Sequence, residues 1–398
     1  MFLRLHQKRN FIMSVWFLLV LVLCLGLASF GTAAEKKETP QGREIHWKKV
    51  AVNAEAKFEA AGIGDINKDG KPDIISGSYW YEAPTWTKHL ISEIQASGTY
   101  FNDFCDLPQD VDGDGDLDVV SVTWFSQEVF WRENPGAADR PWATHSVDKP
   151  GNMETALLVD LNGDGVGDLL PNVMNEVVWY EKQAPKKDAP LWIKRSLGKD
   201  GAGHGIGVGD VNRDGAVDIL TPNGWYEGKK SGRETTWTWH PEFKDLKLGS
   251  TSVPILVDDV NGDGRNDVIW GMGHDYGIYW LEQVEVNGKR EWKRHEIDHS
   301  WSQPHYIAYV DLQGDGRKEL VTGKRYMAHD GHDPGELEPL CIYFYTYNPA
   351  EKRWDRSVID QGTKTGFGLS PAVGDIDGDG DIDLVCPGKS GLFLLIQE

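Results

Sequence analysis

The stretch Asp65-Ile-Asn67-Lys-Asp69-Gly70-Lys-Pro-Asp73 decides the fold of this protein, because variants of it recur seven times along its 398 residues. Each copy reads Asp-x-Asn/Asp-x-Asp-Gly-x-x-Asp, and the sixth is the loosest, with Gln313 at position three and Glu319 at position nine. A repeat of about fifty residues indicates a solenoid, an array or a propeller. The seven copies begin at Asp65, Asp110, Asp160, Asp210, Asp259, Asp311 and Asp375.

Oxygen-bearing side chains at alternate positions, followed by a glycine, predict a tight loop wrapped around a hard cation. Calcium takes about six to eight oxygen ligands, and glycine permits the sharp turn. We therefore expect up to seven Ca²⁺ ions, one in each loop. The predicted ligands are Asp65, Asn67, Asp69, Asp73, Asp110, Asp112, Asp114, Asp118, Asp160, Asn162, Asp164, Asp168, Asp210, Asn212, Asp214, Asp218, Asp259, Asn261, Asp263, Asp267, Asp311, Gln313, Asp315, Glu319, Asp375, Asp377, Asp379 and Asp383.

The loops are not EF-hands, which require a Glu at position twelve and a helix on either side. β-Branched or aliphatic runs such as Ile74-Ile75 follow the motif, and apolar runs such as 156–159 precede it. Each loop is therefore expected to join the strands of a β-hairpin. Position twelve is occupied by Ser76, Ser121, Pro171, Thr221, Trp270, Thr322 and Cys386.

Each repeat continues with an aromatic strand, such as Trp179-Tyr180-Glu181, and then a strand that opens with Trp. Four strands per unit are typical of a propeller blade. The last unit lacks the Trp strand, and Ile45–Val50 precedes the first motif in the same register. We predict an all-β, seven-bladed β-propeller with four antiparallel strands per blade, closed by the N-terminal strand. The aromatics are expected to pack between blades, with sugar stacking as the alternative; the opening residues are Trp86, Trp142, Trp192, Trp237, Trp292 and Trp354.

Three segments are expected: a signal peptide over 1–34, a disordered leader over 35–43 and the propeller over 44–398. Arg4, Lys8 and Arg9 form a basic start and 11–30 an apolar core, before small residues suited to cleavage. We expect a secreted, periplasmic or extracellular protein without stable membrane insertion after cleavage. A retained anchor is the alternative, because the apolar run approaches spanning length.

The net charge of −21 argues against nucleic acid as a partner. Most of the ligand positions in the loops are carboxylates, so the acidity is mainly a property of the predicted metal sites. The three cysteines beyond the signal segment show no spacing that implies a disulfide framework, and we expect buried free thiols. These cysteines are Cys105, Cys341 and Cys386.

The acidic motif and its β-strand context resemble the FG-GAP/VCBS repeat family of calcium-carrying propellers. The resemblance covers nearly the whole chain after residue 43 and implies the propeller fold and calcium. It does not imply one function, because that family includes adhesion proteins, lectins, lyases and dehydratases. The Asp311 unit and the loop after it are also similar to the propeller portion of fungal aldos-2-ulose dehydratases.

The residue six positions before each motif should ring the upper end of the central channel, because the first strand of each blade lines it. Four of these seven positions are ionisable, namely Glu59, Glu154, His204 and His305. Such a group suits an additional divalent metal or an acid–base pair. A polar channel floor with ordinary hydrogen bonds is the alternative.

Loops on the same face add further candidates. The longest one, 324–334, holds Lys324 and Arg325 for an anionic intermediate, with surface salt bridges as the alternative. In the catalytic hypothesis His204 or His305 is the base, and Tyr326 or Glu154 the acid. The remaining predicted ligand-binding residues are Glu59, Asp103, His274, Asp275, His329, His332, Trp124, Asn172 and Asn223.

Three functions remain open. The first is a carbohydrate-active lyase or dehydratase that removes a proton next to a carbonyl or carboxylate. The second is a non-catalytic propeller that binds glycans or a protein partner, and the third is a structural propeller in which calcium serves stability only. No nucleophile elbow or dinucleotide fingerprint appears, and the glycine-rich 203–209 lies on a predicted channel strand.

Overall fold

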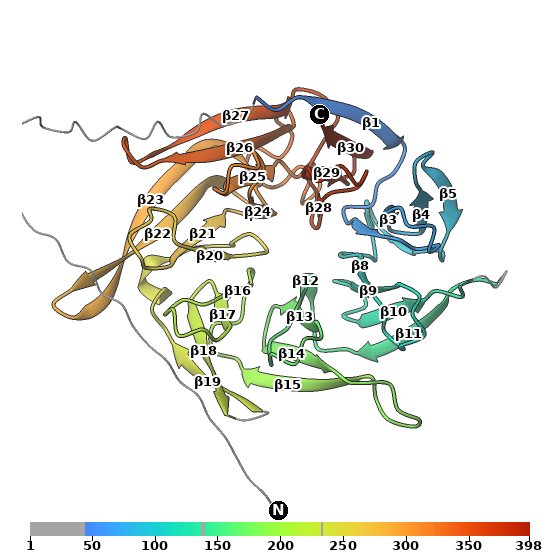
Figure 1. The fold of residues 1–398 in the computed structure, drawn as a ribbon, viewed down its shortest axis with the longest axis horizontal. Helices are drawn as coiled ribbons and strands as arrows, with labels where there is room; N and C mark the ends of the chain where they lie inside the picture. Colours follow the sequence, from blue (N-terminus) through green and yellow to red (C-terminus); the bar gives the residue numbers. More distant parts are fainter. Residues whose placement is uncertain (1–43, 137–139, 232–233) are drawn as a thin grey trace, which may run out of the picture. The chain divides into compact units, whose positions relative to one another are not determined.

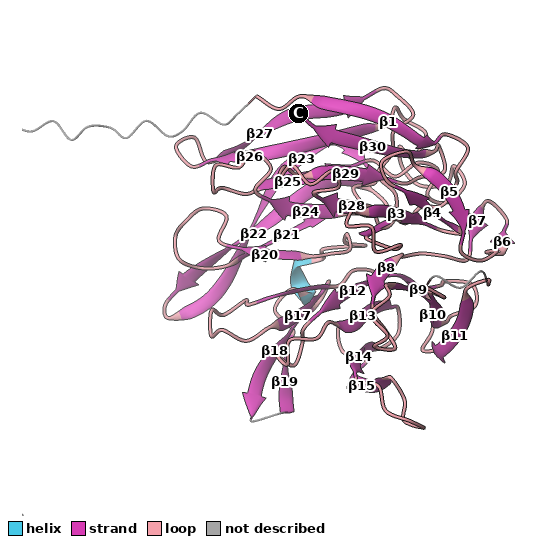
Figure 2. Cartoon of the chain, turned by 45° about the vertical axis from the view of Figure 1, so that its right-hand side comes forward, coloured by secondary structure: helices cyan, strands magenta, loops and turns pink. Residues whose placement is uncertain are grey.

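The computed structural model describes residues 44–136, 140–231 and 234–398. The predicted signal peptide and leader lie outside these residues. Seven four-stranded antiparallel sheets surround a central axis (Figure 1). The predicted seven-bladed propeller is therefore confirmed. Strands make up almost all of its regular structure (Figure 2), and no helix in the described part has the length and apolarity to cross a bilayer.

The first four blades run in sequence order from the inner to the outer strand. Blade one holds β2 (Gly62–Gly64), β3 (Asp73–Ser76), β4 (Tyr79–Glu82) and β5 (Thr87–Leu90). Blade two holds β8 (Leu107–Gln109), β9 (Asp118–Val122), β10 (Val129–Glu133) and β11 (Ala143–Asp148). Blade three holds β12 (Met153–Val159), β13 (Asp168–Val173), β14 (Val177–Lys182) and β15 (Trp192–Gly198). Blade four holds β16 (Gly207–Gly209), β17 (Asp218–Thr221), β18 (Gly224–Ser231) and β19 (Glu234–His240).

The last three blades follow the same plan. Blade five holds β20 (Leu256–Asp258), β21 (Asp267–Gly271), β22 (Tyr276–Val286) and β23 (Lys289–Ser302). Blade six holds β24 (Ile307–Val310), β25 (Glu319–Gly323), β26 (Cys341–Asn348) and β27 (Arg353–Gln361). Blade seven holds β28 (Ala372–Gly374), β29 (Asp383–Cys386), β30 (Leu392–Gln397) and β1 (Trp47–Asn53). Outside the blades lie β6 (Ala96–Ser97), β7 (Tyr100–Phe101) and a 3₁₀ turn, η1 (Lys244–Leu246).

The N-terminal strand closes the ring. Strand β1 pairs antiparallel with β30, with Trp47 opposite Gln397 and Ala51 opposite Phe393. The sheet order β1-β30-β29-β28 places the start of the described chain at the outer edge of the last blade. This pairing covers an edge of β30 that would otherwise present unpaired backbone groups.

The acidic loops join the first two strands of every blade, as the sequence predicts. The glycine at position six has a φ of 85° to 94° in all seven loops, a conformation that disfavours residues with a Cβ. The acid at position nine is fully buried, and in the first loop Asp73 accepts N–H groups from Ile66 and Ala83. This carboxylate therefore ties the loop to the third strand of its own blade.

Small residues on the inner strands allow the blades to approach the axis. A Cβ on Gly207 would lie 1.9 Å from the carbonyl oxygen of Ile255 in the next blade, so that position requires glycine. A channel cavity of about 350 Å³ runs between the inner strands, lined by Gly62, Leu107 and Val373 among others. The glycine-rich segment 203–209 thus serves close blade packing. All three described cysteines are buried free thiols, as predicted.

Candidate metal and acid–base centre

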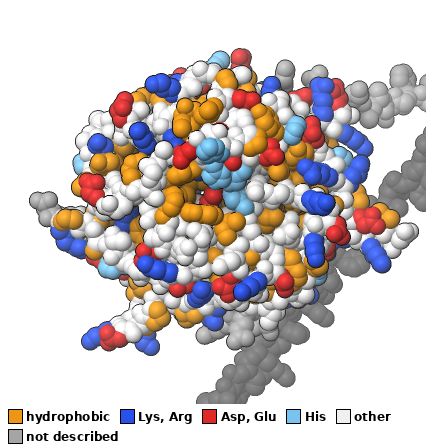
Figure 3. All heavy atoms as spheres, turned by 180° about the vertical axis from the view of Figure 1, so that it is seen from behind, with side chains coloured by type: hydrophobic (Ala, Val, Ile, Leu, Met, Phe, Trp, Pro, Cys, Tyr) orange, Lys and Arg blue, Asp and Glu red, His pale blue; other side chains and the backbone are white. Residues whose placement is uncertain are grey.

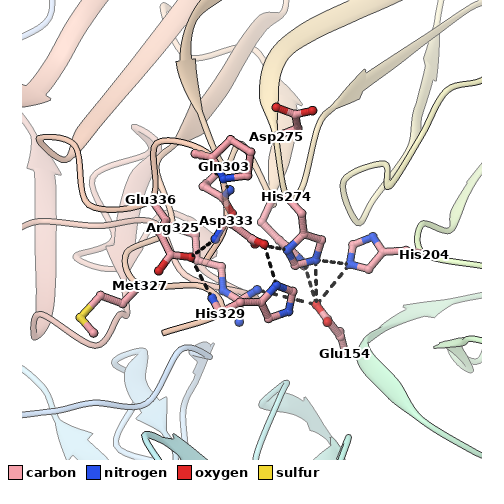
Figure 4. A network of polar contacts seen from close by, with 12 residues as sticks. Glu154, His204, His274, Asp275, Gln303, Arg325, Met327, His329, Asp333 and Glu336 are labelled. Atoms are coloured by element: carbon pink, nitrogen blue, oxygen red, sulfur yellow. Dashed lines mark hydrogen bonds and ion pairs between the residues drawn. The ribbon is translucent and has the colours of Figure 1, made fainter. Parts of the chain in front are cut away.

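Four side chains, two from blades three and five and two from inter-blade loops, converge at one end of the channel. Glu154 comes from β12, His204 and His305 precede β16 and β24, and His274 lies in the β21–β22 turn. The ligand atoms of all four lie within 4.8 Å of one another. Gly273 leaves room for this approach, because a Cβ there would lie 3.1 Å from the His204 ring. The four residues are called the His₃Glu cluster below (Figure 4).

One oxygen of Glu154 faces all three imidazoles. Its Oε2 lies 3.2 Å from His204 Nε2, 2.9 Å from His305 Nε2 and 3.8 Å from His274 Nε2. Ligands held about 2.0–2.2 Å from a common ion in a tetrahedron are roughly 3.4 Å apart. The cluster therefore has the spacing of a metal ligand set.

The hydrogen bonds of two histidines fix where their lone pairs point. His204 Nδ1 lies 2.8 Å from the carbonyl oxygen of Thr251, and His274 Nδ1 lies 2.9 Å from the carboxylate of Asp333. Both partners are acceptors, so each Nδ1 carries a proton, and in its neutral form each ring presents a lone pair at Nε2. These two Nε2 atoms are 2.9 Å apart. Two lone pairs at this distance repel unless a proton or a cation lies between them.

Burial decides the protonation of the rest of the cluster. Burial lowers the pKa of His305 to about 3, against the opposing effect of Glu154, so this imidazole is neutral at physiological pH. Burial raises the pKa of Glu154, but its contacts with His204, His274 and His305 bring it well below its usual value. The cluster thus presents an ionised carboxylate and a neutral buried imidazole, the forms that bind metals.

A second layer comes from the long loop of blade six. The ring of His329 stacks on His274 with centroids 4.5 Å apart, and its Nδ1 lies 2.9 Å from Asp333, which also holds His274. Buried Glu336 accepts the backbone N–H groups of His329 and Asp333, each at 3.0 Å. Glu336 therefore fixes the turn that brings these two side chains to the cluster (Figure 4).

A fixed positive charge lies beside the cluster. Arg325 is buried and donates to Glu59 from Nε at 2.8 Å and from Nη2 at 3.3 Å. Its Nη1 lies 3.8 Å from Glu154 and has no hydrogen-bond partner among the described residues. The buried hydroxyl of Tyr100 is also without a partner there, and burial raises its pKa while the Arg325 charge lowers it. Both groups are buried donors without a partner among the described residues.

The cluster is reachable from one face of the molecule. In Figure 3 a group of histidine side chains lies at the centre of this face, framed largely by hydrophobic and uncharged surface. His305 is fully buried, whereas the His274 side chain is 13% exposed and that of His329 is 47% exposed. A ligand entering from this side meets His329 and His274 before the deeper ligands.

The structure brings together six of the predicted residues: Glu59, Glu154, His204, His274, His305 and Arg325, with His329 stacked behind His274. Lys324 is placed elsewhere, because its Nζ donates to Ser302. Tyr326 lines a separate cavity with Leu337 and Lys364. The neighbouring residues 324, 325 and 326 therefore point in three directions.

The other predicted ligand-binding residues lie outside the cluster. Asp103 is buried beside Arg132 at 3.6 Å, and Asn172 accepts the N–H of Gly205. Trp124 packs on the core of blades two and three. The remaining three, Asp275, His332 and Asn223, are exposed.

Sequence reasoning missed Tyr100, Thr251, Asp333 and Glu336. A signal for Asp333 exists in the sequence, because it stands four residues after His329 in a loop already singled out. Tyr100 and Thr251 carry no such signal, since they lie outside any motif and reach the cluster only through the packing of neighbouring blades.

The acidic loops form a second type of candidate metal site. Carboxylate oxygens at positions one, three and nine lie within 4.8 Å of one another in two loops, those of Asp110, Asp112 and Asp118 and of Asp375, Asp377 and Asp383. These donors are all oxygens, the set that hard cations such as Ca²⁺ prefer.

A model of the FG-GAP-like repeat matches residues 110–170 and 259–322, each of which spans two acidic loops. These two segments match FG-GAP-like repeats. This agrees with the resemblance drawn from the motif and with the propeller. Comparison with curated proteins gave no match.

Several solved structures are similar to this FG-GAP-like propeller. The exotype rhamnogalacturonan lyase YesX is 12% identical, covering 89% of this chain and 74% of its own, with a TM-score of 0.49. Rhamnogalacturonan lyase YesW is 12% identical with the same coverages and a TM-score of 0.47. A putative 6-phosphogluconolactonase from Bacteroides fragilis is 11% identical, covering 77% of this chain and 82% of its own, with a TM-score of 0.41.

Proposed function

We propose that this protein is a secreted, metal-dependent carbohydrate-active enzyme of the lyase or dehydratase type. The observation that carries the proposal is the pair of Nε2 atoms of His204 and His274, 2.9 Å apart beside the carboxylate of Glu154. Because both Nδ1 atoms donate to protein acceptors, the neutral forms of these two rings would direct two acceptors at one another. A cation between the two Nε2 atoms would bind both lone pairs, while each Nδ1 donates its proton to a protein acceptor.

Three imidazoles and one carboxylate favour a borderline transition metal such as zinc, manganese or iron over calcium or magnesium. Such a metal, when bound, supplies Lewis acidity to a carbonyl or carboxylate oxygen of the substrate. Glu154, His204, His274 and His305 would hold it. Asp333 and the Thr251 carbonyl oxygen fix the orientation and tautomer of two of these ligands, which is the usual role of groups behind metal-bound histidines.

The acid–base groups are then residues outside the ligand set. His329 donates its Nδ1 proton to Asp333 and leaves Nε2 as an acceptor at the solvent-exposed side, so it is the candidate base. Tyr100 has a pKa raised by burial and keeps its proton, so it is the candidate acid. The free Nη1 of Arg325 can bind an anionic oxygen of a sugar acid or its enolate.

The proposal is tested by metal analysis of the purified protein followed by an activity screen. We expect about one equivalent of a transition metal that survives dialysis, and anomalous scattering from the His₃Glu cluster. Screening uronate-containing polysaccharides for ultraviolet-absorbing unsaturated products then tests the lyase reaction. Absence of a transition metal after reconstitution with zinc, manganese and iron would contradict the metal centre, and glycan binding without turnover would favour a binding module.

We also propose that the seven acidic loops bind Ca²⁺ and that the chain is exported. The all-oxygen donor sets in the second and seventh loops support calcium. The basic start and apolar core of residues 1–34 support export. Millimolar calcium outside the cell would fill even weak sites. Fractionation of expressing cells and N-terminal sequencing of the exported protein test whether the chain is exported.

The calcium-free protein is expected to lose stability as the pH rises. Burial raises the pKa of Asp118, Asp267 and Glu319 to about 7, and that of Asp168, Asp218 and Asp383 to about 6. The unfolded values are about 4, so the folded state binds more protons in between, and stability falls as the pH rises from about 4 to about 7.

The measurement is the melting temperature in excess chelator at about pH 5 and about pH 8, repeated with calcium. We expect a lower melting temperature at the higher pH in chelator and a rescue by calcium, which binds the ionised carboxylates of the folded state. Neutral His305 has the opposite effect on the pH dependence of stability, but it is one group against the six carboxyl groups named above. A melting temperature in chelator that does not fall would contradict this prediction.

Asp333→Asn is expected to weaken transition-metal binding about 10–100-fold, because the amide cannot hold the His274 tautomer as the carboxylate does. The measurement is competition of the apo-protein with a chromogenic chelator. Asp275→Asn is the matched control, since Asp275 is exposed and adjoins His274 in the same turn. Equal metal affinity of the two variants would contradict the role of Asp333.

A further inference from the structure

Four blades share a packing unit made of a Trp on the third strand and a His and a Glu beside it. The His lies opposite the Trp on the fourth strand, and the two rings stack with centroids 4.3–4.6 Å apart and planes within 20°. The same His lies 2.8–2.9 Å from a Glu two residues after the Trp. The four pairs are Trp80 with His89, Trp131 with His145, Trp225 with His240, and Trp280 with His295.

Blade three keeps the Trp and the Glu but replaces the His. Arg195 lies opposite Trp179 in the strand register, and its Nε donates to Glu181 at 2.7 Å. Within the described residues no aromatic ring and no cation covers Trp179, in contrast to the four stacked blades. Arg195 therefore takes the position that an imidazole fills in the other four blades, and Trp179 is buried.

A cavity of about 510 Å³ lies beside Arg195. It lies between blades three and four, and its wall includes Asn162, Trp179, Arg195, Ser196, Thr235 and Trp237. Asn162 belongs to the acidic loop, so the cavity opens at the end of the blades away from the strand ends that hold the His₃Glu cluster. Its volume is within the range of about 300–1,000 Å³ usual for small-ligand sites.

The charges in this wall are already compensated. Arg195 pairs with Glu181, and Lys194 lies 3.1 Å from Asp148 and 3.8 Å from Glu176. What remains is an indole face of half-buried Trp237 and several neutral polar groups, including a Thr235 hydroxyl without a partner. An aromatic face beside hydroxyl and amide groups suits a ligand with one apolar face and many hydroxyls.

We propose that this cavity binds a neutral saccharide unit and serves as an auxiliary glycan site on the third blade. It shares no residue with the His₃Glu cluster. The proposal goes beyond the proposed function, which could fail without affecting it. The two cations that line the cavity, Lys194 and Arg195, are each paired with a carboxylate, which favours a neutral ligand.

The test is calorimetric titration of the calcium-loaded protein with cellohexaose, xylohexaose, mannohexaose and a galacturonate hexamer. We expect at least one neutral hexamer to bind. Arg195→His should replace the arginine side chain in the cavity wall with an imidazole stacked on Trp179, and weaken binding at least about tenfold. Trp237→Ala is a second variant with the same expected direction. Arg140→His, at an exposed arginine of blade two, is the control and should leave binding unchanged.

Absence of binding by every neutral hexamer at millimolar concentration would overturn the proposal. So would binding that Arg195→His and Trp237→Ala leave unchanged, or binding of the galacturonate hexamer alone. Binding that persists in His204→Ala is the expected result and separates this site from the channel. The melting temperature of Arg195→His shows that lost binding does not come from unfolding.

Discussion

The His204→Ala protein is expected to lose its transition metal and nearly all turnover while keeping the propeller fold. Removing one of four ligands leaves Nε2 of His274 and the carboxylate of Glu154 without the geometry for tight binding. We expect metal affinity to fall at least about 100-fold and turnover about 10³-fold. Metal content, turnover on the responsive polysaccharide and the melting temperature are the measurements.

The matched control is His332→Ala, because His332 lies exposed in the loop that carries His329 and makes no side-chain contact with the cluster among the described residues. It should retain metal and turnover. His305→Ala should lose metal and turnover as His204→Ala does. Because His305 is fully buried, its truncation also leaves a cavity that lowers stability. Full metal content and turnover in both ligand variants would show that the cluster is a polar floor of the channel.

The largest expected loss of stability comes from Arg132→Met, in a buried ion pair between blades one and two. Arg132 is fully buried, lies 2.5 Å from Asp106 and donates to the carbonyl oxygen of Gly77 at 2.6 Å. Its removal leaves the buried carboxylate of Asp106 without a cation, next to buried Asp103. Breaking a buried pair in this way costs about 3–5 kcal/mol.

Denaturant unfolding in saturating calcium measures this change in the free energy of unfolding. Arg140→Met is the control, because the Arg140–Glu133 pair is exposed, and such pairs contribute about 0–1 kcal/mol. Burial and the neighbouring Asp106 raise the pKa of Asp103 well above its usual value, so Asp103→Asn should be tolerated far better than Arg132→Met. A loss below about 1 kcal/mol in Arg132→Met would contradict the structural role of the pair.

Local patterns predicted the architecture correctly because they repeat. Each acidic loop is specified within nine residues, from Asp65 to Asp73 in the first copy, and its apolar flanks fix two strands. Ring closure by 45–50 followed from a missing strand at one end and a surplus strand at the other. Counting six residues back from each loop located Glu59, Glu154, His204 and His305, because every inner strand has the same register to the axis.

Other parts of the site follow no repeat. His274 and His329 come from loops whose conformation depends on packing, and Asp333 reaches both of them only because buried Glu336 holds the turn. Lys324, Arg325 and Tyr326 are neighbours in the chain, yet only Arg325 reaches the cluster. No periodicity sets side-chain direction in such a loop, so sequence reasoning treated all three alike.

The sequence by itself determined the number of blades, the acidic loops and the inner-strand positions that face the channel, since short-range spacing specifies all three. Only the tertiary structure decided which imidazole nitrogens face one another, that Arg325 pairs with Glu59 across the ring, and that a cavity lies between blades three and four. The first two features depend on contacts between residues 47 to 266 positions apart, which closure of the ring creates.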